Sequence, residues 1–364
     1  MLGTLQTPMA PPSASSSSRW RRFALSAAFL CAAFFLLVSL VPPLPPPALS
    51  LDAPACRWVP TIEVCSHQLR GSSAPSGSLD AMTALWRAGV TCFDVDVTLL
   101  EGDGAALLTH PVRLAAATRG SSPSTLAEAR AAGADPVSFP AAEDAVHRFA
   151  DLLATSDPSP RDHHERANPH ERGDVHRATL GGPTLCLDLK GAAMSPATAR
   201  RIVDVAASRG VEPRVLVYVY GASVGEFGAD VLASLRRDVP RVQIGLGRRD
   251  VEPAHGDVAR ALAAEQLRGV SAVVASAAFD LAWYEAAART GLRIISWTVN
   301  GRAAIVEAAR RRVSAFITDE PVESRGTLRD VRRACEDAFG PDGRRPGFGG
   351  EAADGERRRR DAPW

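Results

Sequence analysis

The chain has 364 residues, of which 46% are hydrophobic and 23% charged, and its 42 basic and 41 acidic residues give a formal net charge of +1. This composition excludes an intrinsically disordered chain, a collagen and a multi-span membrane protein, and the length supports one large core or two small ones. The near-zero charge leaves no overall electrostatic footprint for nucleic acid, so we expect no nucleic-acid partner. Lys190 is the only lysine in the chain.

The N-terminal region predicts a membrane anchor. Residues 1–22 contain three arginines and no acid, and residues 23–41 contain no charge over a length that spans a bilayer as a helix. The Pro-rich run that follows argues against a cleaved signal peptide, and the positive-inside rule places the rest of the chain on the lumenal or extracellular side. We therefore expect a cytoplasmic segment (1–22), a type II signal anchor (23–41) and a stiff Pro-rich stalk (42–61). A transit peptide is the main alternative.

The cysteines indicate little metal or redox chemistry, because no C-x-x-C spacing occurs. In an oxidising lumen Cys56 and Cys65 could pair. Cys92 and Cys186 lie within apolar runs, where we expect them to pack as small hydrophobes.

From residue 62 the chain alternates short apolar runs, rich in β-branched residues, with longer Ala- and Arg-rich stretches of helical character. The continuously apolar run 214–220 is typical of a strand covered on both faces in a parallel sheet. Eight such units predict an α/β fold of the (β/α)8 TIM-barrel class over residues 62–338, with a doubly wound open sheet as the alternative. The predicted strands are 62–66, 92–98, 184–189, 214–220, 242–246, 270–275, 293–299 and 314–318. The predicted helices lie near 78–88, 195–209, 223–237, 256–267, 278–290, 302–312 and 324–338.

Two segments depart from this alternation. Residues 111–183 contain no clear strand and only one helical stretch, near 140–154, so we interpret them as an insertion after the second strand and not as barrel wall. The histidines in its second half lie among Arg, Asp and Glu without a pattern and do not indicate a metal site. Residues 339–364 are Gly- and Arg-rich and predict a disordered basic tail.

Polar side chains interrupt the apolar runs where strands end, which in a barrel is the face that carries chemistry. Asp94 and Asp96 lie two residues apart and therefore point to the same face of their strand. Asp188 and Lys190 repeat this arrangement on the next barrel strand. The other polar or aromatic residues at such ends are His67, Arg70, His110, Tyr218, Tyr220, Trp297 and Asn300.

Three carboxylates at one end of a barrel repel one another unless a cation lies between them, and an all-oxygen set favours a hard divalent ion, Mg²⁺ or Ca²⁺. Such an ion beside two histidines and one lysine suits phosphoryl chemistry. The ion and Lys190 offset charge on phosphate oxygens, while one histidine accepts a proton and the other donates one.

These residues resemble the motifs of the glycerophosphodiester phosphodiesterases and the wider phospholipase-C-like barrel superfamily. The matches span about residues 62–321 and are most specific in Trp297-Thr298-Val299-Asn300 and Thr318-Asp319-Glu320-Pro321. The resemblance implies a metal-dependent phosphoric diester hydrolase acting on glycerophosphodiesters or (lyso)phospholipid headgroups. The site that the resemblance implies comprises catalytic His67 and His110; phosphate-binding Lys190 and Arg70; metal ligands Asp94, Asp96 and Asp188; and a pocket of Tyr218, Tyr220, Trp297 and Asn300.

The chain also departs from the phosphodiesterase pattern. Two residues separate His67 from Arg70, where the family has adjacent His and Arg, and Ser76-Gly77-Ser78 replaces the usual Glu-Asn-Thr. Asp188-Leu189-Lys190 is similar to the strand of sphingomyelinase D-type phospholipases, and His110-Pro111 is similar to menorin-like proteins.

Two other classes compete with this interpretation. A lumenal domain, a single membrane span and an Asp-x-Asp pair are also features of Golgi glycosyltransferases. That class needs the pair in a loop after a nucleotide-binding sheet. A non-catalytic barrel that binds a lipid headgroup or a protein is the second alternative, favoured by the interrupted His-Arg-Gly motif.

Overall fold

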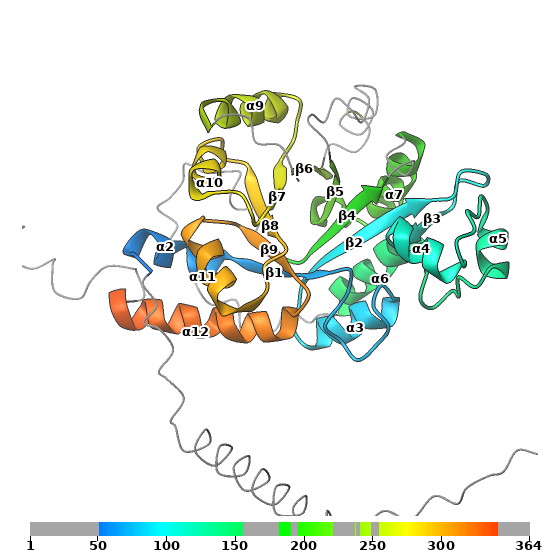
Figure 1. Ribbon diagram of the computed structural model, residues 1–364, viewed down its shortest axis with the longest axis horizontal. Helices are drawn as coiled ribbons and strands as arrows, with labels where there is room; N and C mark the ends of the chain where they lie inside the picture. The colour runs from blue at the N-terminus through cyan, green and yellow to red at the C-terminus, as the bar shows by residue number, and fades with distance from the viewer. Residues whose placement is uncertain are drawn as a thin grey trace, which may run out of the picture. The chain divides into compact units, whose positions relative to one another are not determined.

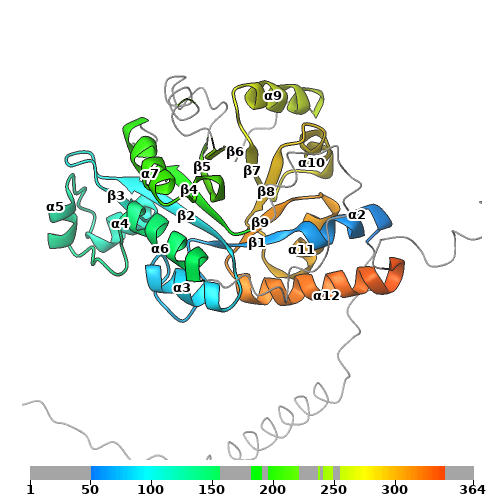
Figure 2. The same cartoon turned by 180° about the vertical axis from the view of Figure 1, so that it is seen from behind.

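The computed structural model describes residues 51–155, 182–190, 196–220, 237, 241–248 and 255–340. These residues form a barrel, with strands at the centre and helices around them (Figures 1 and 2). Eight parallel strands close into a ring, because β1 pairs with both β9 and β2. The ninth strand, β3, pairs antiparallel with β2 outside the ring. The strands are β1 (Glu63–His67), β2 (Cys92–Leu99), β3 (Ala106–Leu108), β4 (Thr184–Lys190), β5 (Val215–Tyr220), β6 (Gln243–Arg248), β7 (Ala272–Ser276), β8 (Arg293–Trp297) and β9 (Ala315–Thr318).

The predicted TIM-barrel class is therefore confirmed, and the open-sheet alternative is excluded. The helices and short 3₁₀ turns are α2 (Ala53–Trp58), η1 (Val59–Thr61), α3 (Leu79–Arg87), α4 (Pro111–Ala117), α5 (Leu126–Ala131), α6 (Ala142–Thr155), α7 (Pro196–Ser208), η3 (Glu212–Arg214), α9 (His255–Leu267), α10 (Leu281–Ala288), α11 (Gly301–Arg310) and α12 (Pro321–Phe339).

Alternation along β2 explains how buried carboxylates reach the barrel interior. Phe93 points outward, where its ring lies 6.3 Å from Phe149 of α6. Because successive side chains of a strand point to opposite faces, Cys92, Asp94 and Asp96 face inward. Cys92 packs in a core of mainly small and aliphatic side chains at the centre of the barrel. The two carboxylates lie further along the strand, toward its carboxyl end.

The interpretation of residues 111–183 as a single insertion is wrong in one respect. Helix α6 contacts both α3 and α7 and takes the place of the barrel helix between β2 and β4. Its apolar side packs inward, with Val146 and Phe149 fully buried. Among the described elements between β2 and β4, those outside the regular barrel are β3, α4 and α5, and they project on one side of it (Figure 1). Residues 156–181 lie outside the described part of the chain.

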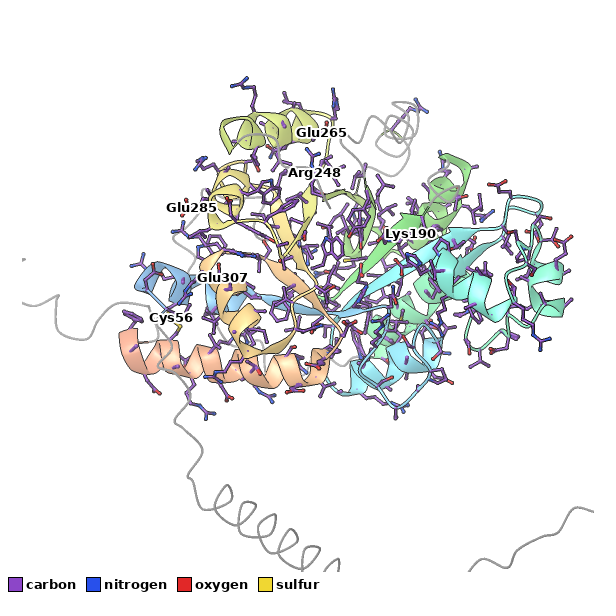
Figure 3. The ribbon with its side chains drawn as sticks, in the orientation of Figure 1. Cys56, Lys190, Arg248, Glu265, Glu285 and Glu307 are labelled. Carbon is purple, nitrogen blue, oxygen red and sulfur yellow. A yellow bond between two sulfur atoms is a disulfide. The ribbon has the colours of Figure 1, made fainter. Side chains whose placement is uncertain are left out.

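The expected stalk is also corrected at its C-terminal end. Residues 53–61 form α2 and η1, and α2 contacts α11 and α12. Cys56 of α2 forms a disulfide with Cys335 of α12 (Figure 3), so this segment belongs to the barrel. The suggested pairing of Cys56 with Cys65 is wrong, because the two cysteines bond to other partners.

A second disulfide joins Cys65 of β1 to Cys92 of β2. These strands are neighbours in the ring and the two residues face each other in register, with their Cα atoms 4.3 Å apart. The expectation that Cys92 packs as a free thiol is therefore wrong. The expectation for Cys186 is confirmed, since it is buried and unbonded.

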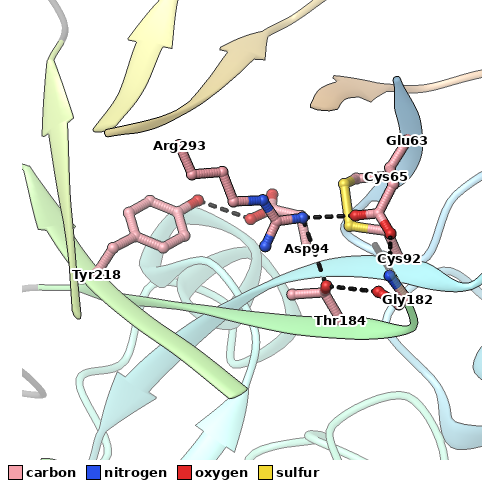
Figure 4. The surroundings of a disulfide bond; sticks show 8 residues. All are labelled: Glu63, Cys65, Cys92, Asp94, Gly182, Thr184, Tyr218 and Arg293. Carbon is pink, nitrogen blue, oxygen red and sulfur yellow. Dashed lines mark hydrogen bonds and ion pairs between the residues drawn. A yellow bond between two sulfur atoms is a disulfide. The ribbon is translucent and has the colours of Figure 1, made fainter. Parts of the chain in front are cut away.

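A buried ion pair closes the end of the barrel where the strands begin (Figure 4). Arg293, at the start of β8, donates to the Glu63 carboxylate of β1 at 2.5 Å. It also lies 3.4 Å from the Thr184 hydroxyl of β4. The Arg293 side chain is 1% exposed, and its Nε and Nη1 atoms have no hydrogen-bond partner among the described residues. Burial raises the pKa of Glu63, and Arg293 offsets this only in part.

Several expectations fall on residues outside the described part of the chain: the segments 1–22 and 23–41, the helix near 223–237 apart from its last residue, and all but the first two residues of the tail. No described helix combines the length and apolar character needed to cross a bilayer.

Candidate active site

A cavity of about 200 Å³ opens at the carboxyl ends of the strands. It brings together nine of the eleven residues predicted for the site; the predicted residues that line it are His67, Asp94, Asp96, His110, Asp188, Lys190, Tyr218, Tyr220 and Trp297. Gln68 and Ile317 complete the lining. The Asp-x-Asp pair thus lies within a barrel strand, which excludes the glycosyltransferase arrangement.

The three carboxylates of the cavity are almost completely buried, at 3–5% exposure. Asp96 and Asp188 are aligned across the β2–β4 pair. Burial, with Asp188 and Asp96 nearby, raises the pKa of Asp94 well above its usual range. Burial also raises the pKa of Asp188 to about 7, although Lys190 opposes it. The single lysine therefore does not compensate the burial of all three carboxylates.

Lys190 lies between two of these carboxylates, at the end of β4 (Figure 3). Its Nζ lies 3.0 Å from Asp96 Oδ1 and also donates to Asp188 Oδ2. Burial lowers the pKa of Lys190, but both carboxylates outweigh it and leave the pKa raised. Lys190 is therefore a permanent cation held at a fixed point of the cavity.

The oxygen donors of the site suit a hard divalent cation, but they do not converge on one point. Asp94 accepts a hydrogen bond from the Tyr218 hydroxyl at 2.7 Å, and Lys190 separates the other two carboxylates. Within the described residues no group of three His, Cys, Asp or Glu side chains is arranged to hold a metal ion. One observation favours a cation: Asp188 Oδ1 is buried without a hydrogen-bond partner in this part of the chain.

A polar network orients His67. Its Nδ1 lies 2.8 Å from Asp319 Oδ1, directly after β9. Asp319 also accepts from Arg70 at 2.7 Å and from Asn300 at 3.1 Å. Although partial burial raises the pKa of Asp319, hydrogen bonds from His67 and Asn300 outweigh it and the pKa is lowered. The carboxylate is thus kept ionised, and Nε2 is the ring nitrogen of His67 left to exchange a proton with a substrate.

This network corrects the placement of two predicted residues. Arg70 bonds to Asp319 and to Gln68, and Asn300 bonds to Asp319, so neither lines the cavity. Through these contacts Arg70 and Asn300 support the loop carrying His67, so Asn300 does not have its expected place in the pocket, and the phosphate contact of Arg70 stays a prediction.

His110 enters the cavity from the segment that follows β3, at the start of α4. Its Nδ1 accepts a hydrogen bond from the Val112 backbone N–H at 3.2 Å, so the imidazole caps the helix. The preceding Thr109 is tied back to β2, because its carbonyl accepts from the Thr98 hydroxyl. The antiparallel strand β3 is therefore what brings His110 to the same end of the barrel as His67.

Aromatic side chains form a third wall. The rings of Tyr220 and Trp297 lie 5.4 Å apart, edge to face, and Lys190 Nζ lies 5.0 Å from the centre of the Tyr220 ring. These residues come from the ends of β5 and β8 and limit the space beside the lysine.

Two residues near the cavity are absent from the predicted site. Gln68 Nε2 donates to Asp96 Oδ2 at 2.5 Å, and Asp319 holds His67. Asp319 could have been found, because it lies in the Thr-Asp-Glu-Pro motif after the last strand. No sequence motif pointed to Gln68, because a glutamine next to a histidine is common in loops.

The fold and the site together define an α/β barrel with an acid-, histidine- and lysine-lined cavity at the carboxyl ends of its strands. The solved structures to which the chain is similar include one described as a glycerophosphoryl diester phosphodiesterase and one described as a glycerophosphodiester phosphodiesterase. One, from Silicibacter pomeroyi, shares 19% identity with a TM-score of 0.50, over 74% of this chain and 94% of the other. The other, from Parabacteroides distasonis, shares 15% identity with a TM-score of 0.50, over 74% and 98%. At these identities the likeness shows a shared barrel fold. No family model matches the sequence, and no curated protein is significantly similar to it.

Proposed function

We propose that the protein is a phosphoric diester hydrolase that acts on glycerophosphodiesters or on (lyso)phospholipid headgroups. The observation that carries the proposal is the convergence of His67, His110 and Lys190 on one cavity from three different segments of the chain. The barrel shared with the proteins described as glycerophosphoryl diester or glycerophosphodiester phosphodiesterases supports it at the level of fold.

In this proposal each group has a separate task. Lys190 neutralises charge on the phosphate oxygens as the phosphorus centre is attacked. One imidazole accepts the proton of the attacking hydroxyl, and the other donates a proton to the departing alcohol. Asp319 keeps His67 in a single orientation for its part in this exchange.

We infer that a divalent cation, Mg²⁺ or Ca²⁺, is the cofactor. Asp94, Asp96 and Asp188 are the candidate ligands, and a bound cation supplies the positive charge that these buried carboxylates lack. Support comes from the unpartnered Asp188 Oδ1. Binding requires Lys190 to release at least one carboxylate, because it now contacts two of them.

We also propose that the barrel lies in an oxidising compartment, attached to a membrane by residues 23–41. Two disulfides within the barrel support this placement, since such bonds persist in secretory and extracellular proteins and are rare in the cytosol. The type II orientation follows from the arginines that precede the apolar run.

The test uses the full-length protein in detergent with Mg²⁺, Ca²⁺ or EDTA. A panel of glycerophosphodiesters, lysophospholipids and sphingomyelin is followed by ³¹P NMR, beside a His67→Ala variant. We expect a new phosphorus signal that needs the divalent cation and is absent from the variant. We also expect the cation to raise the melting temperature of wild type and not that of an Asp188→Asn variant. Folded protein that turns over no substrate would favour the non-catalytic barrel.

A further inference from the structure

Arg113 of α4 lies beside the active site but has no part in the chemistry proposed above. With His110, Gln68, Asp96 and Gly77 it lines a small second cavity. Three of these residues, His110, Gln68 and Asp96, also line the main cavity, so the second cavity forms a side branch on the His110 side of the site.

The surroundings hold the Arg113 guanidinium in place. Its Cζ lies 5.2 Å from the centre of the buried Phe139 ring, a cation–π contact. Gly77 leaves the space for it, because a Cβ atom at that position would lie 2.5 Å from Arg113 Nη1. Gly77 also has a φ of +81°, which disfavours any other residue. The arginine is therefore partly desolvated and positioned before any ligand binds.

Arg113 forms no ion pair with a carboxylate of the described residues, whereas Arg70 is paired with Asp319. Burial and the neighbouring Arg70 lower the pKa of Arg113, and Asp135 offsets this only in part. Asp96, the one acid lining the branch, is itself bonded to Lys190 and Gln68.

We propose that Arg113 forms an anion-binding subsite that selects diesters whose alcohol arm on the His110 side carries a second negative group, a carboxylate or a phosphate. The planar guanidinium binds either group through paired hydrogen bonds, and partial burial strengthens them. A cationic headgroup gains nothing at this position. The inference rests on the proposed function, which identifies the ligand as a phosphodiester.

Matched pairs of substrates test the subsite. Glycerophosphoserine differs from glycerophosphoethanolamine by one carboxylate, and glycerophosphoinositol 4-phosphate differs from glycerophosphoinositol by one phosphate. We expect kcat/KM to favour the charged member of at least one pair, and Arg113→Gln to reduce that preference about tenfold. Arg113→Lys should retain part of it. Arg119→Gln, a change at an exposed residue just after the C-terminal end of α4, is the matched control and should leave the ratio unchanged.

The pair that responds identifies the anion as carboxylate or phosphate. A ratio that Arg113→Gln leaves unchanged in both pairs overturns the subsite, as does a wild type without any preference for the charged members. If wild type hydrolyses no diester, the proposed function fails but the subsite is still tested. Calorimetry then compares the binding of O-phosphoserine with that of phosphoethanolamine, and the binding of inositol 1,4-bisphosphate with that of inositol 1-phosphate. Tighter binding of the more charged member of a pair, lost in Arg113→Gln, supports the subsite. Equal binding of the two members in both pairs overturns it.

Discussion

Lys190 has a charge and a size that only lysine combines. Its ammonium lies between Asp96 and Asp188, with the Tyr220 ring on a further side, so the space around it is already filled. An arginine preserves the charge but replaces a compact group with a broad planar fork. The absence of any other lysine from the chain agrees with a specific requirement at this position.

We predict that Lys190→Arg lowers kcat on the diester substrate by about 100-fold, because the fork does not fit between the two carboxylates and cannot place its charge on the phosphate. Asp96→Asn should have an effect of similar size. Steady-state kinetics measure the loss, and circular dichroism with thermal melting shows whether each variant is folded. The control is Arg209→Lys, because Arg209 forms an ion pair with Asp151 on the protein surface, away from the cavity lining. Activity retained by folded Lys190→Arg would remove the lysine from the mechanism.

At the scale of single elements, β1, β4 and β8 meet in the buried contact of Glu63 with Arg293 and Thr184 (Figure 4). Two nitrogen atoms of the buried Arg293 guanidinium have no hydrogen-bond partner among the described residues, so the Glu63 carboxylate is the main group that balances its charge. Removing one member of a buried ion pair leaves an uncompensated charge, whereas replacing both with apolar residues is often neutral or stabilising.

We predict that Arg293→Met lowers the free energy of unfolding by about 3–5 kcal/mol, because it leaves the buried Glu63 carboxylate without its cation, and that Glu63→Met combined with Arg293→Met recovers most of this loss. Urea denaturation measures both. A double variant no more stable than Arg293→Met would show that the strands need the ion pair itself.

The pH dependence gives a second measurement of the same contact. Because the pKa of Glu63 is raised above 4.5 in the folded protein, the native state binds more protons than the unfolded one between these two values. The contribution of Glu63 to stability is therefore present below about pH 4.5 and falls as the pH rises through the raised pKa. The wild-type free energy of unfolding should show this decrease, and that of Glu63→Gln should lack it.

The strands were predictable because each is a short run of mainly apolar residues, and all eight predicted barrel strands are present. Helix α6 was assigned to an insertion because the residues before it are irregular, and only its contacts with α3 and α7 reveal its place in the helix layer. Nine site residues were predictable as polar exceptions at strand ends. Arg70 and Asn300 were misplaced because their contacts with Asp319 depend on how two distant loops meet.

At the scale of the whole molecule, the two disulfides differ in what they join. Cys65 and Cys92 link neighbouring strands and are fully buried. Cys56 and Cys335 link helices α2 and α12, which are 279 residues apart, and are slightly exposed at 5% and 7%. Neither pairing could be read from the sequence, because each depends on which elements become neighbours in the closed barrel.

We predict that mild reduction of the native protein opens the Cys56–Cys335 bond first, because it is the more accessible to a thiolate. Differential alkylation followed by peptide mapping identifies the cysteines released, and labelling of Cys65 and Cys92 under the same conditions would contradict the assignment.

Loss of this bond frees the longest loop that the barrel closes, so the Cys56→Ser, Cys335→Ser double variant should lose about 3–5 kcal/mol of stability. For a domain of this size that lowers the melting temperature by about 10 °C. The active-site cavity lies at the carboxyl ends of the strands and is lined by no residue of α2. We therefore expect kcat on the diester to be retained below the new melting temperature. A variant that melts like wild type but loses activity would instead link the first and last helices of the barrel to the site.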